Sequence, residues 1–151
     1  VIGKHVWSGV SLSGNNDGST QTGTTVLAIA TTDATATALT TSADTADATN
    51  QLIVNNNSAY AFTGTIVARQ KASEGTASAA WKVEGLIRRE ANAGTTVLVA
   101  STVTALSNAP SWGMALTADT TNGCLKIAAT GAASTNIRWV ATINTSEVLY
   151  A

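Results

Sequence analysis

The chain has 151 residues, a net charge of −1 and a charged fraction of 11%. This length suits one domain with one hydrophobic core, and the near-neutral charge gives no electrostatic case for nucleic acid as a partner. The single cysteine excludes a disulfide framework and a thiolate metal cluster, and no apolar run approaches the length that a membrane helix needs. We therefore expect neither nucleic acid nor a membrane as a partner, and no metal or other cofactor.

The N-terminal third of the sequence contains short strand signals separated by polar, turn-forming stretches. An apolar run in residues 1–12 predicts an edge strand or an arm, and residues 24–32 alternate as a strand does. Residues 36–41 predict a short strand that is followed by a loop rich in alanine and threonine. We expect the whole chain to form one β domain, in which residues 1–49 pack as an arm and edge strands on a core built by residues 50–151.

The strongest strand signal lies in residues 60–69 and 81–88, where apolar and polar side chains alternate with a period of two. Two faces are predicted to point inward: Tyr60, Phe62, Gly64, Ile66 and Ala68 in the first run, and Trp81, Val83, Gly85 and Ile87 in the second. The polar segment between the two runs is long enough to reverse the chain, so the pair is predicted to form an antiparallel ribbon.

The remaining sequence repeats this pattern of short strands and turns. Residues 95–106 predict one strand or a bent pair, and the proline at position 110 interrupts strand pairing. Residues 112–118 and 124–129 are joined by a loop that ends in Asn-Gly, which is a strong hairpin signal. The last strand is predicted over residues 136–144. About eight to ten strands at this spacing predict an all-β fold, an antiparallel β-sandwich that is jelly-roll-like.

Chemistry-bearing residues are few. The only histidine, His5, has no nucleophile or carboxylate beside it in the sequence, and no Gly-x-Ser-x-Gly motif is present. Carboxylates that meet from distant strands, as in a glycosidase, are not excluded by spacing, but we expect no catalytic residues and no enzyme activity. Trp7 and Trp112 stand beside serine, glycine and turn residues, so they are the candidates for stacking on a sugar, whereas Trp81 and Trp139 are predicted to be core residues.

Four segments carry a resemblance to a known class of domain. They are Tyr60 to Arg69 (YAFTGTIVAR), Ala80 to Arg89 (AWKVEGLIRR), Ala118 to Gly123 (ADTTNG) and Asn136 to Thr142 (NIRWVAT). In this order they resemble a β domain of the tail fibres, tailspikes and other virion proteins of tailed bacteriophages, over about residues 50–151. The resemblance implies a surface appendage of the virion, commonly a homotrimer, that is exposed on an extracellular particle and often takes part in host attachment.

The predicted outer face of the strands supports two interpretations. It is either a solvated sheet surface or a contact between subunits of a homotrimer. The residues assigned to the candidate subunit contact are Arg69, Lys82, Glu84, Leu86, Arg88 and Arg138. We therefore expect a virion structural protein that assembles with itself and with other virion proteins, with a host cell-surface glycan as a further candidate partner. The alternatives are a capsid-decorating structural protein and a stand-alone carbohydrate-binding module.

Overall fold

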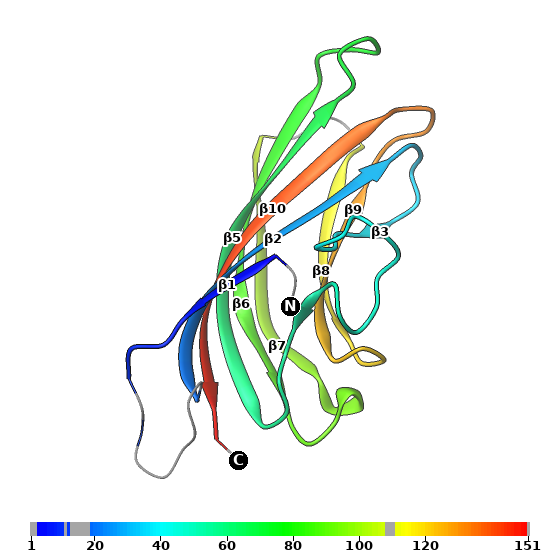
Figure 1. Cartoon of the computed structure of the whole chain (residues 1–151). Helices are drawn as coiled ribbons and strands as arrows, with labels where there is room; N and C mark the ends of the chain where they lie inside the picture. Colours follow the sequence, from blue (N-terminus) through cyan, green and yellow to red (C-terminus); the bar gives the residue numbers. More distant parts are fainter. Residues whose placement is uncertain (1–2, 11, 13–18, 108–110, 151) are drawn as a thin grey trace.

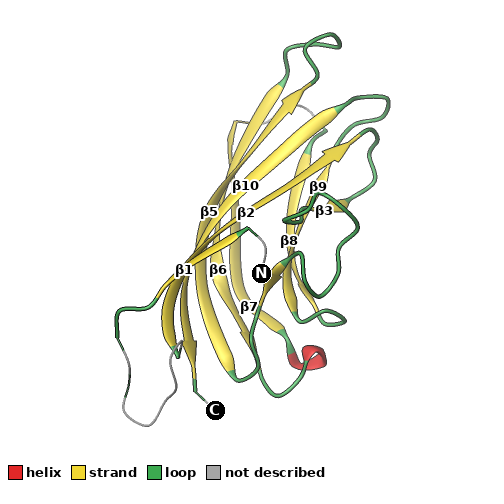
Figure 2. Ribbon diagram, in the orientation of Figure 1, coloured by secondary structure: helices red, strands yellow, loops and turns green. Residues whose placement is uncertain are grey.

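The computed structural model describes residues 3–10, 12, 19–107 and 111–150, which form two facing antiparallel sheets (Figure 1, Figure 2). The strands in chain order are β1 (Lys4–Trp7), β2 (Thr20–Thr31), β3 (Thr37–Ala38), β4 (Leu52–Ile53), β5 (Ser58–Gln70), β6 (Ser78–Arg89), β7 (Val97–Ser107), β8 (Gly113–Asp119), β9 (Cys124–Thr130) and β10 (Ile137–Leu149). One 3-10 turn, η1 (Ala93–Thr95), lies between β6 and β7. The predicted all-β antiparallel sandwich of about eight to ten strands is confirmed.

The larger sheet has six strands in the order β1-β2-β10-β5-β6-β7. The predicted ribbon forms two neighbouring strands of this sheet, because Ser58 of β5 pairs with Arg89 of β6 and Arg69 pairs with Ser78. The last strand, β10, lies between β2 and β5 and pairs with both along its length. This insertion joins the N-terminal part of the chain to the ribbon, so β1 is an edge strand whereas β2 is an internal strand of the sheet.

The smaller sheet is centred on β9, with β8 along one edge and the short strands β3 and β4 along the other. The predicted hairpin between β8 and β9 is present, and its Gly123 has φ +72°, a conformation that glycine adopts readily. The carboxylate of Asp119 accepts hydrogen bonds from the backbone N–H groups of Thr121 and Asn122, at 3.1 and 3.0 Å. The two sheets meet on one side, where Ala28 and Thr40 exchange backbone hydrogen bonds.

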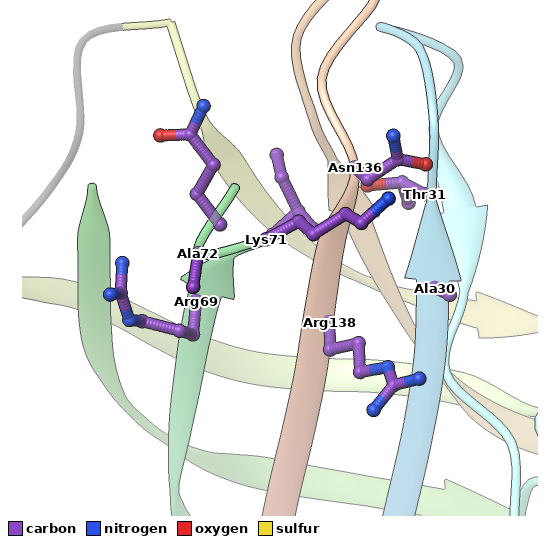
Figure 3. Close-up of a pocket in the computed structure, with 9 residues that line it drawn as sticks. Ala30, Thr31, Arg69, Lys71, Ala72, Asn136 and Arg138 are labelled. Atoms are coloured by element: carbon purple, nitrogen blue, oxygen red, sulfur yellow. The ribbon is translucent and has the colours of Figure 1, made fainter. Parts of the chain in front are cut away.

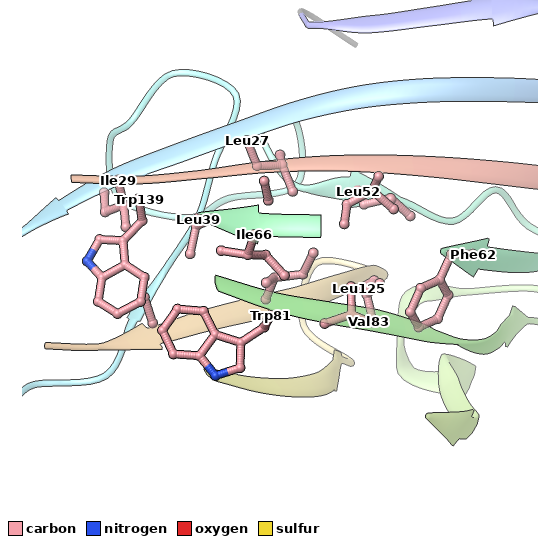
Figure 4. Close-up of a cluster of buried hydrophobic side chains, with 14 of the residues drawn as sticks. Leu27, Ile29, Leu39, Leu52, Phe62, Ile66, Trp81, Val83, Leu125 and Trp139 are labelled. Carbon is pink, nitrogen blue, oxygen red and sulfur yellow. The ribbon is translucent and has the colours of Figure 1, made fainter. Parts of the chain in front are cut away.

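The hydrophobic core lies between the two sheets (Figure 4). The inward faces predicted for the ribbon are the faces that the structure buries, with Trp81 and Val83 beside Phe62 and Ile66 of β5. Trp81 and Trp139 stack with ring centroids 5.5 Å apart, which confirms that both are core residues. Since one cluster spans both sheets, the described residues share a single core.

Several strand boundaries in the structure differ from the predicted ones. β2 begins at Thr20 rather than near residue 24, and β10 runs on to Leu149 rather than ending near residue 144. β7 is one continuous strand, and its pairing with β6 shifts register at two places. The predicted interruption at position 110 lies outside the described residues, as do positions 1, 2 and 11 of the predicted N-terminal strand or arm.

Candidate functional site

The outer face of the six-stranded sheet presents the charged residues of three neighbouring strands. Strand alternation places every second side chain of β5, β6 and β10 on this face. All six residues of the predicted subunit contact are exposed there: Arg69, Lys82, Glu84, Leu86, Arg88 and Arg138. The predicted direction of these side chains is confirmed, whereas their contact with another subunit stays a prediction.

Along β6, the charges on this face occur as local pairs of opposite sign. The ammonium of Lys82 lies 3.6 Å from a carboxylate oxygen of Glu84, and Arg88 forms an ion pair with Glu90. The side chains in both pairs are about half exposed, from 47% to 57%. Such exposed pairs contribute little to stability, but each one neutralises its own part of the surface.

At the other end of the same face, two arginines lie directly opposite each other. Arg138 of β10 pairs with Arg69 of β5 on one side and with Ala30 of β2 on the other. Like charges in directly opposed positions repel, and Figure 3 shows the two guanidinium groups pointing in opposite directions. Arg69 turns away from β10 and donates to the carbonyl oxygens of Ala77 and Gly75, at 3.2 and 3.5 Å. Arg138 extends towards β2 (Figure 3).

A pocket of about 570 Å³ surrounds this row, lined by Ala30, Thr31, Arg69, Gln70, Lys71, Ala72, Asn136, Ile137 and Arg138. In Figure 3 the side chain of Lys71 reaches towards β2, on the same side as Arg138. The pocket therefore has, on its β2 side, one cation from β10 and one from the residue that follows β5. The sequence analysis did not assign Lys71 to a site, although it follows Arg69 by two residues at the end of a strand.

The loop that carries Lys71 is attached to the start of β10. The backbone N–H of Asn136 donates to Glu74 Oε2 at 2.9 Å, its side-chain amide also donates to this carboxylate, and its carbonyl accepts from Lys71 N. These donors stabilise the ionised form and lower the pKa of Glu74. The ammonium of Lys71 is 4.0 Å from a carboxylate oxygen of Glu74. The same carboxylate accepts the hydrogen bonds from Asn136.

The two tryptophans predicted to bind sugar differ in their surroundings. Trp7 lies on the edge strand β1 and is 69% exposed, so its ring is available and sugar binding there stays a prediction. Trp112 is only 7% exposed and packs 5.7 Å from the ring of Trp139. The expectation that the Trp112 ring is exposed is therefore wrong. Serine and glycine beside it in the sequence suggested a surface turn, but the two sheets enclose the ring.

A second surface, which the sequence analysis did not assign, is the flank formed by β7 and β8. The residues of β7 are exposed apart from the partly buried Leu98, and no residue of this strand is charged. Val103 pairs with the buried Val83 and so faces the core side, yet it is 37% exposed. The described part of the smaller sheet ends at β8 and leaves this side chain partly exposed. The sequence signal that could have identified this surface is the run Val97–Ser107, a long strand without a charged residue.

The cysteine and the histidine, which are candidate reactive groups, lie in different environments. Cys124 is fully buried, and burial, together with the charge of Asp119, raises the pKa of its thiol to about 12. The thiol is therefore protonated at neutral pH. His5 is exposed on β1. Among the described residues, no three His, Cys, Asp or Glu side chains lie close enough together to bind a metal ion, and no helix is long and apolar enough to cross a membrane.

The fold defines the chain as an all-β sandwich protein of two antiparallel sheets. In comparisons with known proteins, no family model, no curated protein and no solved structure matches the chain. The resemblance to virion proteins of tailed bacteriophages therefore stays a prediction from the sequence.

Proposed function

We propose that this chain is a structural domain of a virion surface appendage, most simply a tail fibre of a tailed bacteriophage, and that it works by assembling with copies of itself. The phage assignment is supported by the sequence resemblance over about residues 50–151. Assembly is supported by one structural observation, the uncovered and uncharged strand β7 at the edge of the six-stranded sheet.

An edge strand carries a row of backbone N–H and C=O groups that can pair with another chain. Proteins commonly protect such edges with charged residues, proline or a very short strand. β7 spans Val97–Ser107 with neither charge nor proline, and its protection is limited to the two register shifts in its pairing with β6. Four of its large apolar side chains are exposed by 37% to 60%: Val97, Val99, Val103 and Leu106.

A second copy of this chain is the occupant that fits the flank best. Identical surfaces repel when they carry charge of one sign, and a strand without charge avoids this repulsion. The contact would bury Val103 and Leu106 and would extend the six-stranded sheet or complete the smaller one. Pairing of two β7 strands would close as a twofold dimer, whereas a homotrimer, the state implied by the resemblance, would bury three such flanks around its axis through their apolar side chains.

Mass measurement by light scattering during size-exclusion chromatography tests this assembly. We expect the parent chain to form oligomers at high micromolar concentration. A variant with Val103→Lys and Leu106→Lys should be monomeric, because every copy would bring added positive charges into the contact. Both side chains are exposed, so the substitutions should leave the fold intact, as circular dichroism would verify.

The outer sheet face supplies the matched control. Val67 and Val140 are directly opposed on β5 and β10 and are 54% and 42% exposed, so Val67→Lys with Val140→Lys adds the same charge elsewhere. If this control dissociates the oligomer and the β7 variant does not, the subunit contact lies on the outer face and the β7 proposal is wrong. A parent chain that remains monomeric at all concentrations contradicts assembly through either surface.

The virion assignment has its own test. Antibodies against the purified domain should decorate the tail fibres of phage particles that encode this chain, as seen by electron microscopy. Decoration of the capsid would favour a capsid-decorating protein instead. Particles without any decoration, together with protein found only free in the lysate, would contradict a virion role.

A further inference from the structure

The pocket at the Arg69–Arg138 row is lined by three cations, Arg69, Lys71 and Arg138, and the one carboxylate paired with any of them among the described residues is that of Glu74, 4.0 Å from the ammonium of Lys71. On the outer face, Lys82 and Arg88 each have a carboxylate partner within β6 or just after it. Among the described residues, no carboxylate lies within 4 Å of Arg138, and no protein group accepts a hydrogen bond from its guanidinium. Within the same described residues, the acceptors of Arg69 are neutral backbone carbonyls.

The arrangement of the side chains determines where an anion would bind. Arg69 turns towards β6, whereas Lys71 and Arg138 both extend to the β2 side of the pocket, the ammonium of Lys71 near Asn136 and Thr31 and the guanidinium of Arg138 further along β2, past Ala30 (Figure 3). Ala30 lies opposite Arg138 in the next strand, and its methyl side chain leaves room above β2. The guanidinium of an arginine can bind a carboxylate or sulfate through two parallel hydrogen bonds, and a lysine adds a compact charge.

The size and composition of the pocket limit the class of ligand. A volume of about 570 Å³ falls in the range of small-molecule sites, so it accommodates more than a single inorganic ion. No aromatic side chain of the described residues lines it. A nucleic acid would need a line of cations that follows its backbone, whereas this site is local. An acidic sugar fits both the volume and the local charge of the pocket, because it carries one carboxylate or sulfate group on a small polar ring.

We propose that Arg138 binds the carboxylate or sulfate group of an acidic sugar in the pocket beside β2, and that Lys71, on the same side of the pocket, adds to the attraction. The site lies on the outer sheet face, away from the β7 edge, because β6, β5 and β10 separate β2 from β7. Sugar binding and self-assembly through β7 are therefore independent properties that different measurements detect. In a polysaccharide, several acidic units would engage several copies of the domain at once.

Biolayer interferometry with immobilised polysaccharides tests the proposal at two salt concentrations. The probes are polygalacturonate, which carries carboxylates, dextran sulfate, which carries sulfates, and neutral dextran. We expect at least one acidic polymer to bind, neutral dextran not to bind, and binding to weaken with salt. Preference for one acidic polymer would identify which of the two groups the pocket accepts.

Two double variants separate a specific site from a general effect of charge. Lys71→Ala with Arg138→Ala should weaken binding about tenfold or more, because charge-assisted hydrogen bonds are lost. Lys82→Ala with Arg88→Ala removes the same charge from the same sheet face, but from residues that do not line the pocket, and should change binding less than about twofold. All four side chains are exposed, so the variants should fold, and unfolding curves would verify this.

Three results would overturn the proposal. One is equal loss of binding in both double variants, which would indicate attraction to the general charge of the face. Another is a failure of both acidic polymers to bind better than neutral dextran. The third is a change in oligomeric state in the Lys71→Ala, Arg138→Ala variant without any sugar binding by the parent, which would assign Arg138 to a contact with a second copy.

Discussion

Lys4 and Glu147 form an ion pair that links the first described strand to the last, with 2.5 Å between Lys4 Nζ and Glu147 Oε1. Their side chains are only 12% and 2% exposed, although β2 separates β1 from β10 in the sheet. The pair passes over Gly23 of β2, where an added Cβ would lie 2.6 Å from Lys4 Cε and 2.9 Å from Glu147 Oε1. Gln21 donates to the second oxygen of the same carboxylate at 2.6 Å. The N-terminal edge strand is thus held by a buried charge pair.

Removal of one member of this pair should destabilise the domain strongly. Lys4→Met leaves the Glu147 carboxylate buried without its cation, and we expect a loss of about 3 kcal/mol in the free energy of unfolding. The double variant Lys4→Met, Glu147→Gln leaves no buried charge and should recover most of that loss. Urea unfolding of the three proteins measures both effects. A loss below about 1 kcal/mol in the single variant would show that the charge is well solvated.

The close approach of β5 and β10 predicts a second large effect. A Cβ at Gly64 would overlap the backbone oxygen of Thr142 and would lie 2.5 Å from Ile143 Cδ1. Gly64→Ala should therefore cost roughly 1–3 kcal/mol through overpacking. Gly113→Ala is the matched control, because its nearest neighbour would be Thr130 Cβ at 3.7 Å. Thermal or urea unfolding should show the control to be equal to the parent or slightly more stable.

Because Trp112 is buried and Trp7 is exposed, we expect their alanine variants to differ in the free energy of unfolding. Trp112→Ala should destabilise the protein by about 3 kcal/mol or more, because it opens a cavity against Trp139. Trp7→Ala should change stability by no more than about 0.5 kcal/mol, because the Trp7 ring is exposed. Denaturant unfolding compares them, and similar losses would contradict these placements. Weaker binding to host cells by the Trp7 variant, at unchanged stability, would support the sugar-stacking role predicted for Trp7.

The raised pKa of Tyr60 predicts how the free energy of unfolding changes at alkaline pH. Burial, and then the negative charge of Glu147, raise the pKa of Tyr60 to about 12, whereas an unfolded tyrosine ionises near pH 10. Above pH 10 the unfolded chain loses this proton before the folded chain does, so rising pH favours unfolding. The contribution of Tyr60 is complete below pH 10 and is lost as the pH rises to about 12.

Variants can isolate this contribution. Because the pKa of Cys124 is also raised to about 12, all proteins in the comparison should carry Cys124→Ala. We expect Tyr60→Phe to flatten the fall in unfolding free energy between pH 10 and 12 relative to the parent. Equal slopes in the parent and the Tyr60 variant would mean that this phenol ionises normally in the folded state.

Strand character was predictable from local alternation, but the order of strands was not. The pattern from Tyr60 to Arg69 repeats every two residues, and such a pattern requires only that one face of a strand is buried. The placement of β10 between β2 and β5 depends on contacts between residues more than 70 positions apart, such as Trp139 with Ala68 and Ile29. This strand order could not be predicted from any local pattern in the sequence.

The candidate sites depended even more on tertiary structure. Trp112 resembled a surface residue because its neighbours in the sequence are small and polar, and its packing against Trp139 became visible only in the folded chain. Arg69 and Arg138 were both predicted to point outward, but their position in one cross-strand row follows from the β5–β10 register. Lys71 joined them because Asn136 holds its loop against the start of β10.

The sequence by itself determined the β class, the antiparallel ribbon and the inward faces of its strands, because alternation and turn chemistry act over a few residues. Only the tertiary structure decided which strand lies at an edge and which cations share a pocket, because these relations depend on how distant segments pair. β7 has the apolar composition of a core strand, yet it lies at the edge of the larger sheet, beyond the cover of the described part of the smaller one. That difference makes it the surface through which we propose that the domain assembles.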